Sequence, residues 1–146
     1  MKTLVIDAEE AIREGLAGIF GNNGVCDTAE NGQIGLDLVQ KSFELNMPYA
    51  LVMLDIVLPE IDGGTIIKRI RANELKYGVD TLNEARILVV SHRKDEPTIL
   101  NAFRNGASGW ISKPVDMEHI LNKIKNLTSG HLADLGSIHH PPVLTY

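Results

Sequence analysis

The sequence predicts an α/β fold with a parallel β-sheet that is covered by helices on both faces. Short aliphatic runs, each ended by polar or turn-forming residues, alternate with longer segments whose apolar residues recur at helical spacing. This alternation is typical of βαβ units with buried parallel strands. A length of 146 residues with 44% hydrophobic composition provides one well-buried core, and it is too short for two ordinary domains.

Five strands and five helices can be assigned along the chain. The strands are predicted at residues 3–6, 25–29, 50–54, 87–90 and 109–111. The first helix is expected before the turn signal at 21–24, the second after residues 31–32 and the third after residues 62–63. The last two are expected at about 96–105 and 116–126, and Asp116 is predicted to cap the fifth. The apolar faces that support them are Ile12, Leu16, Ile19 and Phe20; Leu36 and Val39; Ile66, Ile67 and Ile70; Leu100 and Phe103; Ile120, Ile124 and Leu127. The polar connection at 73–86 is long enough for an extra helical turn.

Charge and targeting signals exclude several functional classes. The net charge is −5 and no basic run is present, so we expect no direct binding to nucleic acid or to a membrane surface. The first apolar run stops at Asp7, far short of a signal peptide core or a membrane span. The single cysteine, Cys26, can form no internal disulfide. The sequence therefore predicts a cytoplasmic protein.

Four chemically complementary residues follow strands of the predicted sheet. Asp7 follows the first strand, Asp55 the third, Ser91 the fourth, and Lys113 lies just beyond the fifth. Ligands of open parallel sheets bind outside the carboxyl ends of the strands. A poorly solvated carboxylate such as Asp55 can attack phosphorus when Lys113 and a divalent cation balance its charge. Taken singly, each residue has a simpler interpretation as a helix cap or a solvated side chain.

A hard cation suits this group of residues. Mg²⁺ prefers carboxylate, water and phosphate oxygens, so Asp7 and Asp55 are its natural ligands. Ser91 could donate a hydrogen bond to a phosphoryl oxygen. In contrast, His131, His139 and His140 in the C-terminal segment lack helical ligand spacing and a cysteine partner, so we do not expect a metal there.

The chain resembles the receiver domains of two-component response regulators over residues 1 to about 127. The motifs that carry the resemblance occur in order. They are the acidic first loop in LVIDAEEAIRE, the phosphoacceptor strand and loop in LVMLDIVLPEIDGG, the hydroxyl after ILVV, and the aromatic-x-x-Lys-Pro ending in NGASGWISKPV. We therefore divide the chain into a receiver domain, 1–127, and a tail, 128–146, that is a linker or an extra helix.

The resemblance implies a flavodoxin-like, doubly wound five-stranded sheet of order 2-1-3-4-5. It implies that Asp55 accepts a phosphoryl group from a histidine kinase or phosphotransfer protein and that Lys113 pairs with it. Ser91 and Trp110 would form the switch that alters the surface of the fourth helix, fifth strand and fifth helix, although Trp110 could equally be a core or interface aromatic. The expected metal is Mg²⁺, bound by Asp7, Asp55 and the backbone carbonyl of Val57. A cis Lys113–Pro114 bond is also expected.

One departure from the family pattern bears on the metal. Most receivers have a second acid after the first strand, and here that position is Ala8. The change removes a ligand, and it also removes a like-charge repulsion of up to roughly 4 kcal/mol at 4 Å. We expect weakened Mg²⁺ binding. Glu9 is long enough to reach the cation, and a solvated or helix N-terminal role is the alternative. His92 is expected to narrow access to Asp55, and the apolar Val57 to slow hydrolysis of the phosphoaspartate.

Other functions fit less well. A pseudo-receiver that binds partners without phosphate is the nearest alternative, favoured by Ala8 and disfavoured by retention of Asp55 and Lys113. A haloacid-dehalogenase-type phosphatase would need an acid at Val57, and a nucleotide- or flavin-binding enzyme would need glycines where the acidic first loop lies. We predict no enzyme activity beyond gain and loss of phosphate. An output domain or effector is the expected further partner, and a homodimer is a hypothesis.

Overall fold

The computed structural model describes residues 1–22 and 24–132, and its centre is a five-stranded parallel sheet. The strand order is β2-β1-β3-β4-β5, so the predicted order 2-1-3-4-5 is confirmed. The strands β1, β3 and β4 are aliphatic and almost wholly buried, as expected of strands that are covered on both faces, whereas the edge strand β2 is partly exposed. The strands are β1 (Lys2–Ile6), β2 (Val25–Ala29), β3 (Leu51–Leu54), β4 (Arg86–Ser91) and β5 (Gly109–Ser112).

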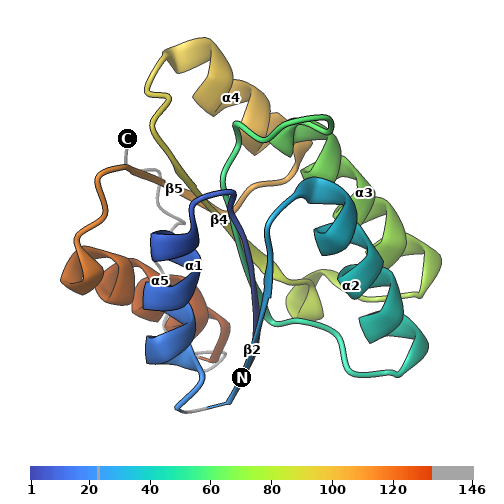
Figure 1. The fold of residues 1–146 in the computed structure, drawn as a ribbon. Coiled ribbons are helices and arrows are strands. Elements are labelled where there is room, and N and C mark those ends of the chain that lie inside the picture. Colours follow the sequence, from blue (N-terminus) through green and yellow to red (C-terminus); the bar gives the residue numbers. More distant parts are fainter. Residues whose placement is uncertain (23, 133–146) are drawn as a thin grey trace.

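Helices cover both faces of this sheet (Figure 1). α1 (Glu10–Phe20) and α5 (Met117–Leu132) lie on one face, and α2 (Gly32–Glu44), α3 (Gly63–Lys76) and α4 (Glu96–Asn105) lie on the other. The buried residues form two clusters accordingly. One joins the sheet to α2, α3 and α4 and includes Ile66, Ile67 and Trp110. The other joins it to α1 and α5 and includes Leu16 and Ile120.

The elements agree closely with the sequence patterns, and the main differences concern β4, β5, α4 and the connection before β4. β4 continues through Ser91 and β5 through Ser112, so Ser91 ends its strand instead of following it. On α4 the buried residues are Ile99 and Ala102, whereas Leu100 is only half-buried. The predicted connection at 73–86 is shorter in the structure, because α3 continues to Lys76 and β4 begins at Arg86. It holds one 3₁₀ turn, η1 (Thr81–Asn83), as its length allowed.

The predicted tail begins inside a helix. Residues 128–132 continue α5, and residues 133–146, which include His139 and His140, lie outside the described residues. The Asp116 carboxylate accepts the N–H of Glu118 at 2.9 Å, which confirms the predicted cap. Within the described part of the chain, no helix has both the length and the apolar character needed to cross a membrane.

The sheet topology brings two strand ends together. β1 pairs with β2 on one side and β3 on the other, and Ile6 lies level with both Ala29 and Leu54. Beyond the strands the pairing continues, since the N–H of Asp7 donates to Ala29 and the N–H of Asp55 donates to Ile6, both at 3.0 Å. The two aspartates therefore leave adjacent strands at the same carboxyl edge.

A buried ion pair ties α3 to the amino edge of the sheet. The Arg71 guanidinium donates to Glu74 at 2.7 Å, to the Ala85 carbonyl at 2.8 Å and to the Gly106 carbonyl at 2.8 Å. Glu74 is 4% exposed and accepts the N–H of Ala85 at 2.6 Å. Arg71 thus joins the end of α3 to the approach to β4 and to the connection between α4 and β5.

Arg71→Met should lower the free energy of unfolding by about 3 kcal/mol, because it leaves the Glu74 carboxylate buried without its cation. Arg69→Met, on an exposed position of the same helix, is the matched control and should change stability little. Urea unfolding followed by Trp110 fluorescence measures both. Equal stability of the two variants would show that the Arg71 network contributes nothing.

Candidate functional site

The carboxylates of Asp7 and Asp55 are held in place by the backbone that follows their strands. Asp7 Oδ1 accepts the N–H of Glu9 at 2.9 Å, and Asp55 Oδ1 accepts the N–H of Val57 at 2.9 Å. Asp7 is 2% exposed and Asp55 is 6% exposed. Because each carboxylate is fixed through one backbone bond, its orientation is set before any ligand arrives.

The Lys113 ammonium lies between these carboxylates. It donates to Asp55 Oδ2 at 3.0 Å and lies 2.9 Å from Asp7 Oδ2. The side chain of Lys113 is 2% exposed. β5 and the register with β4 position it, since the N–H of Lys113 donates to the Ser91 carbonyl at 2.8 Å. The predicted cis bond between Lys113 and Pro114 is present.

Glu9 provides a third carboxylate to the same ammonium. It occupies the N-cap position of α1, yet its side chain makes no capping hydrogen bond. Instead the carboxylate accepts a hydrogen bond from Lys113, and its Oε2 lies 3.7 Å from Nε2 of His92. The Glu9 side chain is 49% exposed. It therefore lies at the solvent boundary of a site whose other members are buried.

The electrostatics of the cluster follow from burial and from the shared ammonium. Burial raises the pKa of Asp7, against the opposing effects of the Glu9 N–H and Lys113. The hydrogen bond from Lys113 lowers the pKa of Glu9. Burial alone would lower the pKa of Lys113, but its bonds to Glu9, Asp7 and Asp55 outweigh that effect and raise it. Lys113 is thus charged at any physiological pH.

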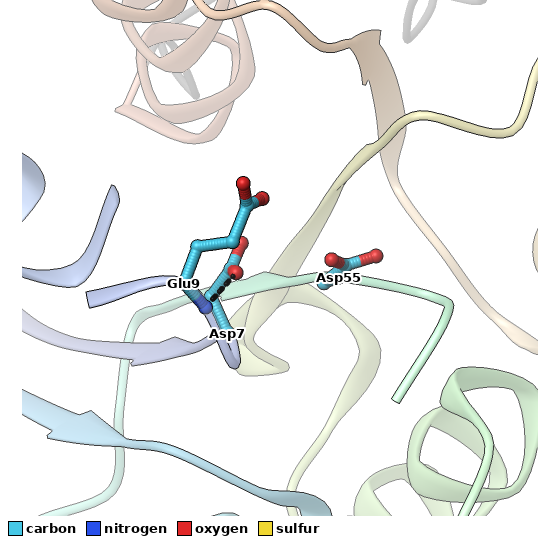
Figure 2. A group of neighbouring side chains, drawn as sticks. All are labelled: Asp7, Glu9 and Asp55. Atoms are coloured by element: carbon cyan, nitrogen blue, oxygen red, sulfur yellow. Dashed lines mark hydrogen bonds between the residues drawn. The ribbon is translucent and has the colours of Figure 1, made fainter. Parts of the chain in front are cut away.

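The arrangement suits a divalent cation. Asp7, Glu9 and Asp55 each offer an oxygen, and these oxygens lie within 4.8 Å of one another; Figure 2 shows the Glu9 carboxylate above Asp7, with Asp55 across from both. With Lys113 included, the three carboxylates leave a net charge of −2. Hard oxygen ligands with uncompensated negative charge are what Mg²⁺ requires. The residues present therefore fit the metal.

The remaining predicted residues, Ser91, Trp110 and His92, differ in their burial and contacts. Ser91 is fully buried at the end of β4, and its hydroxyl accepts the N–H of Arg93 at 3.2 Å. Trp110 is 1% exposed within the core, and its Nε1 has no hydrogen-bond partner among the described residues. The His92 side chain is 67% exposed. Of the predicted residues, Asp7, Glu9, Asp55 and Lys113 are thus in direct contact, whereas Ser91 reaches Lys113 through its backbone and Trp110 lies in the core.

An open groove lies beside Val57, between the loop after β3 and the start of α4. Arg93 forms one wall and donates to Asp95 at 2.7 Å and to Thr98 at 3.0 Å. The groove is lined by Ile56, Val57, Asp62, Gly64, Arg93, Asp95, Pro97, Thr98 and Asn101. Sequence reasoning did not identify Arg93, although its place two residues after Ser91 was a usable signal. It also missed the contact between Glu9 and Lys113, which joins residues far apart in the chain.

Asp7→Asn should raise the free energy of unfolding of the metal-free protein at neutral pH. Burial disfavours the charged Asp7 carboxylate, and Asn keeps an oxygen for the Glu9 N–H. The folded pKa lies above the ordinary value of 3.8, so the gain is complete above the folded pKa and shrinks as the pH falls toward 3.8.

Urea unfolding at a series of pH values, without divalent cations, measures this effect. Asp37→Asn, on the exposed surface of α2, is the control and should show no such pH dependence. Loss of stability in Asp7→Asn at neutral pH would show that the ion pair with Lys113 outweighs the cost of burial.

Comparison with known proteins identifies close similarity to one family. The family model for the response regulator receiver domain matches residues 3–125. The transcriptional regulatory protein DltR of Streptococcus agalactiae serotype III is 29% identical over 86% of this chain and 50% of its own length. A probable C4-dicarboxylate response regulator, DctR, of Bacillus subtilis is 35% identical over 66% of this chain and 37% of its own length. The chain thus spans about half the length of the first curated relatives, DltR among them, and less of DctR.

Solved structures of other proteins share the fold of this chain. A two-component response regulator from Clostridium difficile has 27% identity and a TM-score of 0.72, over 94% of this chain and 99% of that one. The complex of CheX and CheY with BeF₃ and magnesium from Borrelia burgdorferi has 22% identity and a TM-score of 0.74, over 88% of this chain and 89% of that one. With the family model covering nearly all described residues, the chain belongs to the response regulator receiver domain family of two-component systems.

Proposed function

We propose that this chain is a working phosphoacceptor, in which Asp55 takes a phosphoryl group from the phosphohistidine of a histidine kinase or phosphotransfer protein. The observation that carries the proposal is the geometry of Asp55. One of its carboxylate oxygens is held by the N–H of Val57 at 2.9 Å, and the other faces the Lys113 ammonium at 3.0 Å. The nucleophile is thus oriented, and a cation is placed beside the position that the new charge would take.

The proposed phosphoryl transfer forms one bond and breaks one bond. An Asp55 oxygen forms a bond to phosphorus while the bond between phosphorus and the donor imidazole nitrogen breaks. The phosphohistidine reacts with its other ring nitrogen protonated, so it leaves as neutral imidazole and no further proton is needed. Lys113 stabilises the charge on the phosphoryl oxygens, and it does so without a change in its own protonation. Bound Mg²⁺ would neutralise further charge on the same oxygens. The residues of this chain that would hold it are Asp7, Asp55 and the carbonyl of Val57, with Glu9 as a further carboxylate.

We further propose that Ser91 and Trp110 transmit the change. The Ser91 hydroxyl is buried and engaged only with the Arg93 N–H among the described residues, so a phosphoryl oxygen on Asp55 is a stronger acceptor that could reorient it. Trp110 is paired in register with Val89 on the neighbouring strand. A shift of Ser91 at the end of β4 would reach β5 through this pairing and alter the surface formed by α4, β5 and α5.

The proposed partners follow from this role. They are the phosphodonor protein, an output domain or effector that reads the switched surface, and a second copy of the chain. One solved relative is described as the beryllofluoride-activated dimer of the NtrC4 receiver domain, which supports testing for a homodimer. We place the exchange in the cytoplasm, as the sequence predicts, with 1–127 as the receiver unit.

A small phosphodonor with Mg²⁺ should add one phosphoryl group to the wild-type chain and none to Asp55→Asn, since the variant lacks the nucleophile. Intact-mass spectrometry measures the adduct, and Asp37→Asn, at an exposed site, should be modified like wild type. An unmodified wild-type chain would instead support the pseudo-receiver interpretation that Ala8 favours. An adduct on Asp55→Asn would place the acceptor elsewhere.

Ser91→Ala should uncouple the switch from phosphorylation. The variant should still acquire the phosphoryl group, more slowly, but the change in Trp110 fluorescence that accompanies modification of wild type should be absent. Ser112→Ala, at the residue paired with Ser91 in the sheet, is the matched control and should keep the change. A full fluorescence change in Ser91→Ala would exclude this serine as the transmitting residue.

A further inference from the structure

Glu9 is attached to the site differently from the other two carboxylates. Asp7 and Asp55 are buried, and each accepts a backbone N–H that fixes it. Glu9 is 49% exposed at its side chain, and among the described residues the cations paired with its carboxylate are Lys113 and His92, the latter at 3.7 Å. Among the three acids bonded to Lys113, Glu9 is therefore the one whose side chain can move without breaking the local backbone structure.

All three donors of the Lys113 ammonium are in use. They are directed to Asp7, to Asp55 and to Glu9, and an ammonium has three N–H groups and no more. A phosphoryl group on Asp55 needs one of these donors. Because Asp7 and Asp55 are fixed and buried, the donor to be released is the one that Glu9 occupies.

The position of Glu9 also bears on the metal. Its oxygen lies within 4.8 Å of the oxygens of Asp7 and Asp55. Mg²⁺ holds its ligands at about 2.1 Å in an octahedron, so ligand oxygens are separated by roughly 3 to 4 Å. A small movement of the long Glu9 side chain would bring it within that range. Ala8, where the family pattern has a second acid, cannot contribute a carboxylate.

We propose that Glu9 exchanges between two cations, pairing with the Lys113 ammonium in the metal-free protein and with the divalent cation when it is bound. The exchange supplies the carboxylate that Ala8 lacks, and it releases one Lys113 N–H for the phosphoryl group. Metal binding thereby makes a Lys113 N–H available to the phosphoryl group, in addition to balancing the charge at Asp55. This inference rests on the proposed phosphoacceptor function and its Mg²⁺ site.

The first test is the Mg²⁺ affinity of variants, measured by isothermal titration calorimetry. Glu9→Gln should weaken binding on the order of tenfold, because affinity for hard cations follows the number of charged ligands. Glu10→Gln, at the exposed neighbouring residue in the first turn of α1, should bind like wild type. Adding Ala8→Asp to Glu9→Gln should restore the affinity, since Ala8 is exposed and has room for a carboxylate.

The second test observes Lys113 directly, by NMR of its ¹⁵N-labelled ammonium assigned with Lys113→Arg. In wild type, Mg²⁺ should shift this signal as Glu9 leaves it. In Glu9→Gln the metal-free signal should already be displaced from the wild-type position, and Mg²⁺ should add a smaller change.

The outcomes separate this inference from the proposed function. If wild type binds Mg²⁺ and is phosphorylated while Glu9→Gln binds the metal equally well, the exchange is wrong and the phosphoacceptor function stands. If Mg²⁺ leaves the Lys113 signal of wild type unchanged, the release of Lys113 is wrong. If wild type binds no Mg²⁺ and acquires no phosphoryl group, the proposed function and the inference both fail.

Discussion

The burial of one ammonium among three carboxylates is the interaction on which the site depends. Lys113 is 2% exposed at its side chain, and Asp7 and Asp55 are nearly as inaccessible. Removing such charges from water costs several kcal/mol per ion, and only close pairing with additional hydrogen bonds offsets that cost. The backbone N–H groups of Glu9 and Val57 provide those bonds. These bonds offset only part of the cost for Asp7, because burial still raises the pKa of its carboxyl. The cluster keeps a net negative charge that a further cation can balance.

The parallel sheet explains why these groups meet. β1, β3 and β4 are adjacent, and β5 extends the same edge, so residues that follow the strands gather at their carboxyl ends. The backbone pairing continues past the strands through the N–H groups of Asp7, Asp55 and Lys113. As a result, the sheet hydrogen bonds that position the core also set the spacing of the reactive side chains. Core stability and site geometry have the same physical origin here.

The sequence predicted this framework because its signals are local. The aliphatic strands and the glycines and aspartates around them give the strand order once the family motifs are recognised, and the bounds of β2 and α4 agree with those predicted. The inner face of α4 was partly wrong because two overlapping apolar spacings, one through Ile99 and one through Leu100, fit the same helix, and only packing selects between them. The Glu9–Lys113 bond and the Arg71–Glu74 network could not be predicted, since they depend on side-chain conformations and on contacts between distant segments.

Ala8 removes a metal ligand, but it also lowers the charge repulsion in the metal-free site. An acid at position 8 would add a fourth negative charge to a cluster whose net charge is already −2. The repulsion among these charges would destabilise the metal-free protein until a cation was bound. Glu9 occupies the N-cap position of α1, but its side chain makes no capping hydrogen bond, and its carboxylate pairs with Lys113 instead. The absence of an acid at position 8 therefore avoids this repulsion in the metal-free protein. In the proposed exchange, the availability of Lys113 depends on where Glu9 lies, so metal binding would affect how readily Asp55 accepts a phosphoryl group.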